Sequence, residues 1–268
     1  MRPRAAAGVD LRMPALDELL LFPGPPPTTN PASIGRPDYR EVRFPNGNGR
    51  ELHGWFLPAT AADPVGTVLI SHGNGGNIGR FLPWADASAG PDRNVFLYDY
   101  QGFGGSEGRP EIASLAGDGR AALAHVLGRT DPGCRRVVLF GLSLGTVVSL
   151  AVAAAGRPEI AGLVLEGAFS PRIEAARIFG AAAAALIPLP PGVVPERHAA
   201  GLTAPSLFLQ AGADAVTSTE GARKLYEAAG GEKDWREWPG AAHLQPVFAD
   251  PVGYRQVLRS FLSRVLAG

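Results

Sequence analysis

Three residue types that together perform nucleophilic acyl chemistry occur along the chain in the order serine, aspartate, histidine. Ser143 lies in a G-x-S-x-G pattern, Asp214 lies shortly after an apolar run, and His243 ends the sequence Gly-Ala-Ala-His. A serine hydroxyl needs a base near neutral pKa to take its proton, and that base needs a carboxylate to orient it. The pattern therefore predicts a triad of Ser143 as nucleophile, His243 as general base and Asp214 as the orienting carboxylate.

The G-x-S-x-G pattern lies in the setting that its chemistry requires. An apolar run precedes it and the helical pattern TVVSLAVAAA follows it, so Ser143 falls in a strand-to-helix turn. Glycines at 141 and 145 permit this turn, because larger side chains would collide with the strand and the helix. Leu144 supplies the first backbone N–H of the helix, which has no acceptor within the helix. We expect this N–H to form one half of an oxyanion hole.

A second glycine-rich loop, Ser-His-Gly-Asn-Gly-Gly-Asn, follows the apolar run at 67–70. Small residues let the backbone approach a ligand closely, and this is where the other oxyanion donor belongs. We assign that donor to the backbone N–H of Asn74, with the N–H of Gly75 as the alternative. His72 precedes the glycines, and we expect it to brace the loop by hydrogen bonding rather than to act as the base.

Four other histidines compete with His243 for the role of base. Only His243 lies late in the chain in a loop that glycine flanks, between a strand-like run at 234–238 and the last helical pattern. His53 belongs to an expected hairpin and His125 to an expected helix. His198 remains the alternative, because it lies near the expected cleft.

The carboxylate also has alternatives. Asp214 lies after a strand and falls between the serine and the histidine in chain order, as the triad requires. Glu166, which follows another strand, is the stronger alternative acid. Asp99 also follows a strand but precedes Ser143, and we expect it to hydrogen-bond the surrounding loops.

The elements that must position these residues alternate between apolar runs and helical patterns. This alternation predicts an α/β protein with a parallel sheet that helices cover on both faces. Ligands of such sheets bind beyond the carboxyl ends of the strands, where all the candidate residues lie. The expected strands are 67–70, 94–98, 136–140, 161–165 and 206–209, and the expected helices are 78–89, 112–127, 144–155, 219–229 and 254–266.

The N-terminal part of the chain has a different character. Residues 22–37 are too rich in proline for a helix or a central strand, and we expect them to run extended over the surface. Two alternating runs, 39–44 and 51–57, then predict an antiparallel hairpin at a sheet edge. We therefore expect a proline-rich lead-in segment over residues 1–38 and a single domain over residues 39–268.

The composition limits the partners and the location of the protein. Lys plus Arg and Asp plus Glu number 25 each, so no basic field is present to hold nucleic acid, and we expect a small-molecule partner. The single cysteine, Cys134, rules out a disulfide within the chain and a multi-thiolate zinc site. The N-terminus lacks the continuous apolar stretch of a secretion signal, and prolines interrupt the most apolar segment, 178–195. We expect a cytoplasmic protein without a membrane span.

The segments HGNGGN, YDYQGFGGSEG, GLSLG, GADAV and GAAH, in this order, resemble the α/β-hydrolase superfamily over nearly the whole chain. LLFPGPPP, the hairpin, HGNGGNIGR and DYQGFGGSEG are similar to the group that contains the Bem46-like proteins and the mammalian ABHD13 and ABHD17 hydrolases. The resemblance implies the α/β-hydrolase fold with eight mostly parallel strands, a triad at Ser143, Asp214 and His243, and no metal or organic cofactor. The chain departs from the family at Ala211, where a glycine is usual, and we do not expect the N-terminal membrane anchor of many relatives.

These observations predict a serine hydrolase that cleaves carboxylic ester or thioester bonds through an acyl-enzyme. Residues 168–200 connect two expected strands, and we expect them to form a small apolar lid. The same triad could serve a peptidase, an amidase or an acyltransferase. A non-catalytic binding module that keeps the fold is the remaining alternative.

Overall fold

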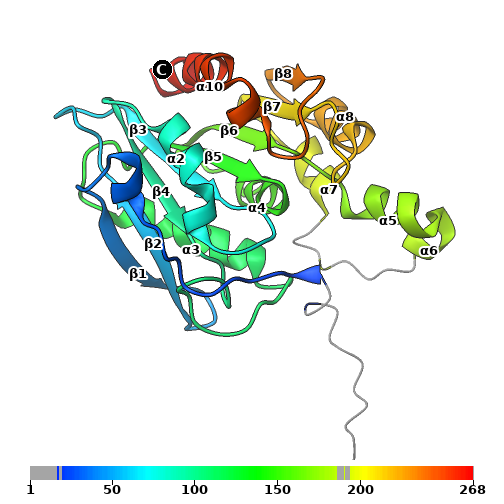
Figure 1. Cartoon of the computed structure of the whole chain (residues 1–268), viewed down its shortest axis with the longest axis horizontal. Coiled ribbons are helices and arrows are strands. Elements are labelled where there is room, and N and C mark those ends of the chain that lie inside the picture. Colours follow the sequence, from blue (N-terminus) through cyan, green and yellow to red (C-terminus); the bar gives the residue numbers. More distant parts are fainter. Residues whose placement is uncertain (1–16, 18–19, 186–189, 191–193, 268) are drawn as a thin grey trace, which may run out of the picture.

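One eight-stranded sheet organises the computed structural model, which describes residues 17, 20–185, 190 and 194–267 (Figure 1). The strands follow the order β1-β2-β4-β3-β5-β6-β7-β8. β1 pairs antiparallel with β2 and β2 pairs antiparallel with β4, whereas all the remaining pairs are parallel. The strands are β1 (Arg40–Pro45), β2 (Glu51–Leu57), β3 (Gly66–Ser71), β4 (Arg93–Tyr98), β5 (Val137–Leu142), β6 (Ile160–Glu166), β7 (Ser206–Ala211) and β8 (Lys233–Trp238).

The sheet confirms the predicted fold class and the predicted hairpin. β1 and β2 form the hairpin, with β1 at the edge of the sheet. β3 to β7 are buried on both faces almost throughout, which is why each reads as an apolar run. β8 lies at the opposite edge and alternates between exposed and half-buried residues up to Trp238. The carboxyl ends of β3, β5, β6 and β7 therefore meet at one edge of the sheet.

Helices cover both faces of the sheet, and each face has its own apolar core. Successive residues of β5 alternate between the two cores: Leu139 belongs to one and Phe140 to the other. α3, α4, α7 and α8 pack on the first face, and α2, α9 and α10 pack on the second. The helices are η1 (Pro31–Ile34), η2 (Ile78–Phe81), α2 (Leu82–Ser88), α3 (Leu115–Gly128), α4 (Leu144–Ala153), α5 (Pro171–Phe179), α6 (Ala181–Ala185), α7 (Pro195–Ala200), α8 (Thr219–Ala228), α9 (Pro246–Ala249) and α10 (Pro251–Leu266).

The expectation that the proline-rich segment contains no helix is wrong at Pro31–Ile34, which forms the 3-10 helix η1. Asn30 caps this turn, since its side chain accepts a hydrogen bond from the N–H of Ala32 at 3.1 Å. Pro31 occupies the first helical position, where a missing N–H costs nothing. Proline is disfavoured in the interior of a helix but is common at its first position.

The region of the expected lid contains α5, α6 and α7, and α5 and α6 extend away from the sheet (Figure 1). Residues 186–189 and 191–193 of this region lie outside the described residues, and the lid itself stays a prediction. Within the described ranges, no helix combines the length and the apolar character that crossing a membrane demands.

Candidate active site

Ser143 lies in a strained turn between β5 and α4. Its backbone has φ 52° and ψ −115°, a region that residues with side chains rarely adopt. The turn is tight because a Cβ at Gly145 would overlap the carbonyl of Ser71. The N–H of Ser143 donates to the carbonyl of Glu166 at 2.8 Å, which ties the turn to the end of β6. The strained backbone presents the hydroxyl beyond the carboxyl end of the sheet, as the sequence pattern predicts.

The structure brings His243 and Asp214 to this serine. His243 Nε2 lies 3.1 Å from Ser143 Oγ, and His243 Nδ1 lies 2.7 Å from Asp214 Oδ2. His243 comes from the loop after β8, and the next residue, Leu244, has a positive φ of 56° that turns the chain there. The three side chains thus form one hydrogen-bonded series from hydroxyl to imidazole to carboxylate. This is the geometry in which a serine can give up its proton.

Asp214 is fully engaged by hydrogen bonds. Its Oδ1 accepts from the backbone N–H groups of Val216 and Thr217, each at 2.8 Å, and its Oδ2 accepts from Thr217 Oγ1 at 2.8 Å. Burial pushes the pKa of this carboxyl up, but the hydrogen bonds from His243 and Thr217 outweigh burial, so the net pKa is lowered. Asp214 therefore stays ionised at neutral pH. Sequence reasoning missed Thr217, although a threonine three residues after an aspartate is a common partner in such turns.

The two predicted oxyanion donors occupy suitable places. Leu144 is the first residue of α4, so its N–H precedes the first intrahelical hydrogen bond. Within the described part of the chain, the N–H of Asn74 has no acceptor. The N–H of the alternative residue, Gly75, donates to the carbonyl of Gly73 at 3.0 Å. The geometry therefore favours Asn74 over Gly75 as the second donor.

A segment far away in the sequence holds the loop that carries Asn74. Residues 20–25, which we call the N-terminal strap, run along this loop. The side chain of Asn74 accepts from the N–H of Phe22 at 3.0 Å and donates to the carbonyl of Leu20 at 2.6 Å. Gly76 donates to the carbonyl of Phe22 at 3.0 Å and accepts from the N–H of Gly24 at 2.7 Å. The strap thus fixes the loop from its outer side, a role that the sequence did not indicate.

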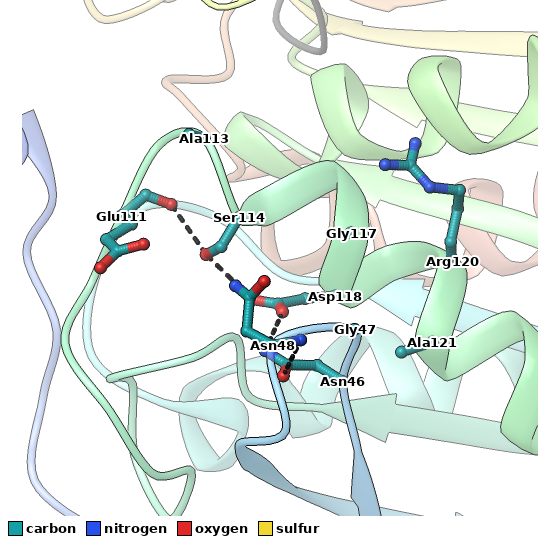
Figure 2. A pocket seen from close by; sticks show the side chains of 10 residues that line it. All are labelled: Asn46, Gly47, Asn48, Glu111, Ala113, Ser114, Gly117, Asp118, Arg120 and Ala121. Atoms are coloured by element: carbon teal, nitrogen blue, oxygen red, sulfur yellow. Dashed lines mark hydrogen bonds between the residues drawn. The ribbon is translucent and has the colours of Figure 1, made fainter.

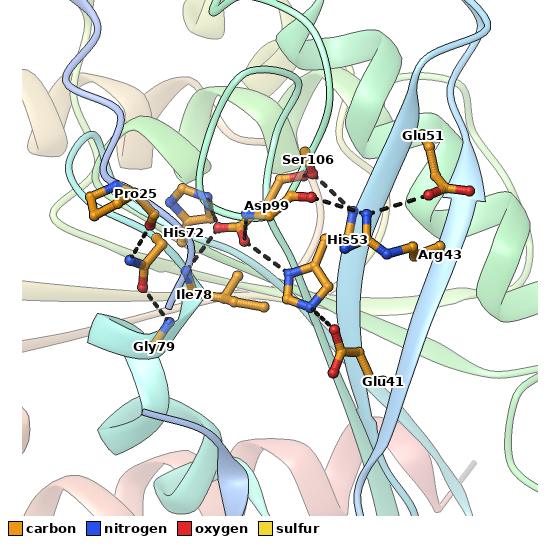
Figure 3. A network of polar contacts seen from close by, with 12 residues as sticks. Pro25, Glu41, Arg43, Glu51, His53, His72, Ile78, Gly79, Asp99 and Ser106 are labelled. Carbon is orange, nitrogen blue, oxygen red and sulfur yellow. Dashed lines mark hydrogen bonds and ion pairs between the residues drawn. The ribbon is translucent and has the colours of Figure 1, made fainter. Parts of the chain in front are cut away.

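A buried polar network fixes the same loop from the inner side (Figure 3). His72 Nδ1 lies 2.8 Å from the carbonyl of Gly73. Asp99 Oδ1 accepts from the N–H of Ile78 at 2.8 Å, and Asp99 Oδ2 lies 3.2 Å from Nδ1 of His53 on β2. Burial lowers the pKa of His72, which keeps its imidazole neutral. The expectations that His72 and Asp99 brace the loops by hydrogen bonding are confirmed.

The alternative acid and base lie elsewhere. Glu166 is completely buried, and its Oε2 accepts from Trp84 Nε1 at 2.9 Å and from the Tyr254 hydroxyl at 2.5 Å. Burial raises its pKa to about 7. The imidazole of His243 is hydrogen-bonded to Asp214 and not to Glu166. His198 lies on α7 and does not line the cavity at Ser143.

A cavity of about 460 Å³ adjoins the serine and the histidine. Part of the lining is the glycine-rich loop, and an apolar part comes from Phe81 of η2, Trp84 of α2 and the residues in and before α9. None of Trp84, Phe248 and Arg80 was expected here from the sequence. The lining residues are Gly73, Asn74, Gly75, Arg80, Phe81, Trp84, Ser143, Val216, His243, Leu244, Gln245 and Phe248.

A larger cavity, of about 650 Å³, lies over the start of α3 (Figure 2). Its polar centre is Asp118, whose Oδ1 accepts from the side chain of Asn46 at 2.8 Å and whose Oδ2 accepts from the N–H of Gln101 at 2.9 Å. These bonds tie α3 to the hairpin turn and to the loop after β4. The Ser114 hydroxyl lies 3.4 Å from Asp118 Oδ2, but no histidine is among the residues that line this cavity, so the hydrogen-bonded series of serine, histidine and aspartate is found at the smaller one.

The described ranges contain neither a cluster of potential metal ligands nor an exposed thiol. No group of three or more His, Cys, Asp or Glu side chains there is arranged to hold a metal ion. Cys134 is buried, and burial raises the pKa of its thiol, which makes it a poor nucleophile.

Comparisons of sequence and fold place the chain among known proteins. A family model described as serine aminopeptidase, S33, matches residues 62–195, half of the chain. The protein Rv2307c of Mycobacterium tuberculosis is 31% identical over 249 residues, which cover 91% of this chain and 86% of that protein. The protein bem46 of Schizosaccharomyces pombe is 32% identical over 116 residues, which cover 43% of this chain and 39% of that protein. The esterase Pf2001 of Pyrococcus furiosus has a similar fold, with a TM-score of 0.75, 17% identity and coverage of 92% of this chain and 98% of that one.

Proposed function

The chain belongs to the α/β hydrolases, in the group that includes Bem46, and from this premise we propose that it cleaves carboxylic ester or thioester bonds through Ser143, His243 and Asp214. The observation that carries the proposal is the continuous series of contacts from Ser143 Oγ to His243 Nε2 at 3.1 Å and from His243 Nδ1 to Asp214 Oδ2 at 2.7 Å. A serine in this environment is an activated nucleophile.

The first half of the reaction makes an acyl-enzyme. Ser143 Oγ attacks the carbonyl carbon of the substrate while His243 Nε2 takes the hydroxyl proton. Asp214, which its hydrogen bonds keep ionised, holds the imidazole in the required tautomer and stabilises the imidazolium. The backbone N–H groups of Asn74 and Leu144 stabilise the negative oxygen of the tetrahedral intermediate. The intermediate collapses when His243 gives its proton to the leaving alcohol or thiol.

The second half releases the acyl group. Water enters the cavity, His243 takes a proton from it, and the resulting hydroxide attacks the acyl carbon that Ser143 holds. The same two backbone donors stabilise the second tetrahedral intermediate. When that intermediate collapses, His243 returns the proton to Ser143 and a carboxylic acid leaves.

A peptidase that recognises a free amino group is the second candidate, because the matching family model is described as a serine aminopeptidase. An ammonium group in a protein site is usually paired with a carboxylate. The described lining of the cavity includes no Asp or Glu side chain, and its one cationic side chain, Arg80, would repel an ammonium group. The cavity therefore supports esters better than aminopeptides.

The test compares leaving groups on one enzyme. We expect hydrolysis of p-nitrophenyl butyrate and of a butyryl thioester of N-acetylcysteamine, much slower hydrolysis of alanine p-nitroanilide, and no turnover by Ser143→Ala. Faster turnover of the anilide than of the ester would favour the aminopeptidase. Transfer of the butyryl group to an added alcohol in preference to water would identify an acyltransferase. Absence of turnover with all substrates would favour the binding module.

A further inference from the structure

The cavity beside Ser143 has one cationic side chain and no anionic one among the described residues that line it. Arg80 is that cation, and it lies on η2, directly after the glycine-rich loop. The rest of the lining is apolar or uncharged apart from His243. A negatively charged group bound beside Arg80 therefore meets one attractive charge and no carboxylate among the described lining residues.

The glycine-rich loop makes room for the side chain of Arg80. Gly76 has a φ of 79°, and a Cβ at this residue would overlap Cδ of Arg80, so the absence of a side chain there makes room for the arginine stem. Nη1 of Arg80 lies 3.9 Å from the position that a Cβ of Gly75 would take. The arginine stem thus passes Gly76, and the guanidinium lies beside Gly75. Asn77 caps η2 through its bond from the N–H of Gly79 at 2.9 Å and so fixes the helix that carries the arginine.

No partner neutralises the guanidinium within the described part of the chain, where Arg80 forms neither an ion pair nor a side-chain hydrogen bond. The two acids nearest to the chemistry are already engaged: Asp214 with His243 and Thr217, and Glu166 with Trp84 and Tyr254. Some other arginines pair with acids, as Arg255 does with Asp86 at 2.5 Å, whereas Arg259, like Arg80, forms no ion pair within the described part of the chain.

The apolar part of the cavity lining suits a hydrocarbon chain. Trp84 and Phe248 meet edge to face with ring centroids 5.6 Å apart, and Phe248 keeps 53% of its surface exposed. Phe81 and Leu244 extend this apolar wall. An exposed aromatic side chain beside a catalytic cavity is available to cover a ligand.

We infer that the substrate is an amphiphilic ester that carries a carboxylate or a phosphate group, and that Arg80 binds this anionic group while the aromatic wall takes the hydrocarbon part. Arginine suits the task because its planar guanidinium donates two parallel hydrogen bonds to a carboxylate or a phosphate. The inference rests on the ester hydrolysis proposed above and adds the class of substrate.

The experiment compares two pairs of substrates that differ only by the anion. Monomethyl suberate against methyl octanoate places a carboxylate on the acyl part, and octanoyl glycerol phosphate against monooctanoylglycerol places a phosphate on the alcohol part. Wild type, Arg80→Gln and Arg80→Lys are assayed with all four substrates. The control is Arg259→Gln, which removes the same charge from α10, outside the residues that line the cavity.

We expect wild type to prefer the anionic member of at least one pair, and Arg80→Gln to lower the ratio of kcat/KM for anionic over neutral ester by about tenfold or more. Arg80→Lys should keep part of the preference, and Arg259→Gln all of it. The pair that responds identifies the source of the anion. An unchanged ratio in Arg80→Gln, or a preference of wild type for the neutral member of both pairs, would overturn the inference.

The same data separate this inference from the proposed function. Hydrolysis of neutral esters that depends on Ser143, together with an anionic-to-neutral ratio of kcat/KM that is the same in wild type and Arg80→Gln, contradicts only the anion site. Absence of hydrolysis with every ester in the wild-type enzyme contradicts both proposals.

Discussion

The indole N–H of Trp84 donates to Oε2 of Glu166 at 2.9 Å, so an aromatic side chain that lines the cavity beside Ser143 is attached to a buried carboxyl at the end of β6. The hydroxyl of Tyr254 donates to the same oxygen, and Oε1 of Glu166 has no partner within the described residues. Burial raises the pKa of Glu166 to about 7. The position of Trp84 therefore depends on a group that changes charge near neutral pH.

Glu166 should make the stability of the protein fall as the pH rises. The pKa of Glu166 in the folded protein lies above its ordinary value of 4.5. Its contribution to the free energy of unfolding is therefore fully present below about pH 4.5 and is lost as the pH rises through about 7. Glu166→Gln keeps an acceptor for Trp84 and Tyr254 and removes the ionisation. As the pH rises between these values, we expect the free energy of unfolding of the variant to increase relative to that of wild type by up to about 3 kcal/mol, because each unit of pKa shift corresponds to about 1.4 kcal/mol.

Urea unfolding at several pH values measures this difference. The control is Glu227→Gln, which makes the same substitution on the exposed face of α8. A constant offset between Glu166→Gln and wild type across the range would show that Glu166 does not titrate in this way.

The side chain of Asn74 should matter for turnover through its hydrogen bonds to the N-terminal strap. Asn74→Ala removes both hydrogen bonds to the N-terminal strap and keeps the proposed oxyanion donor. Displacement of the backbone N–H of Asn74 should lower kcat by between about 10-fold and 100-fold, which is less than the effect expected from losing this donor altogether. The change in KM should be smaller than the change in kcat. Asn30→Ala is the matched control, because the side chain of Asn30 caps η1 through the N–H of Ala32 and does not hydrogen-bond the strap or the glycine-rich loop. Equal kcat values for Asn74→Ala and wild type would show that the hydrogen bonds between Asn74 and the strap do not affect turnover.

Two glycines should respond in opposite ways to alanine. Gly145→Ala places a Cβ into the carbonyl groups of Ser71 and His72, and we expect a loss of several kcal/mol, about 3 or more, or no folded protein at all. Gly117, on α3, has open space around its Cβ position, so Gly117→Ala should stabilise the protein by about 0.5 to 1 kcal/mol. Thermal unfolding of both variants checks the pair. A soluble Gly145→Ala protein with wild-type stability would contradict the described turn.

Much of the fold was predictable because local patterns of apolar residues and glycines indicate the strands and the turn at Ser143. Each central strand is buried on both faces and therefore reads as an apolar run, and the glycines around Ser143 record a turn that larger residues cannot form. Strand boundaries were close: the hairpin strand 51–57 was predicted with the bounds that the structure gives it. The helix expected at 112–127 begins only at Leu115, because the apolar pattern extends through the preceding turn.

The surroundings of the site could not be predicted, because they depend on contacts between distant segments. Phe22 meets Asn74 across 52 positions, and Trp84 meets Glu166 across 82. Neither pair leaves a periodic signal in the sequence. Arg80 follows the glycine-rich loop by only a few positions, but its place in the cavity depends on a stem that passes over Gly76. A sequence pattern can identify the reacting residues more readily than the residues that select the substrate.

Labelling with a fluorophosphonate probe, followed by mass spectrometry of the labelled peptide, tests the central claim most directly. We predict that the wild-type protein carries the probe on Ser143, that Ser143→Ala carries none, and that His243→Ala and Asp214→Asn react more slowly in that order of severity. Labelling of Ser143→Ala at the wild-type rate, or of another residue in the wild-type protein, would contradict the proposed mechanism.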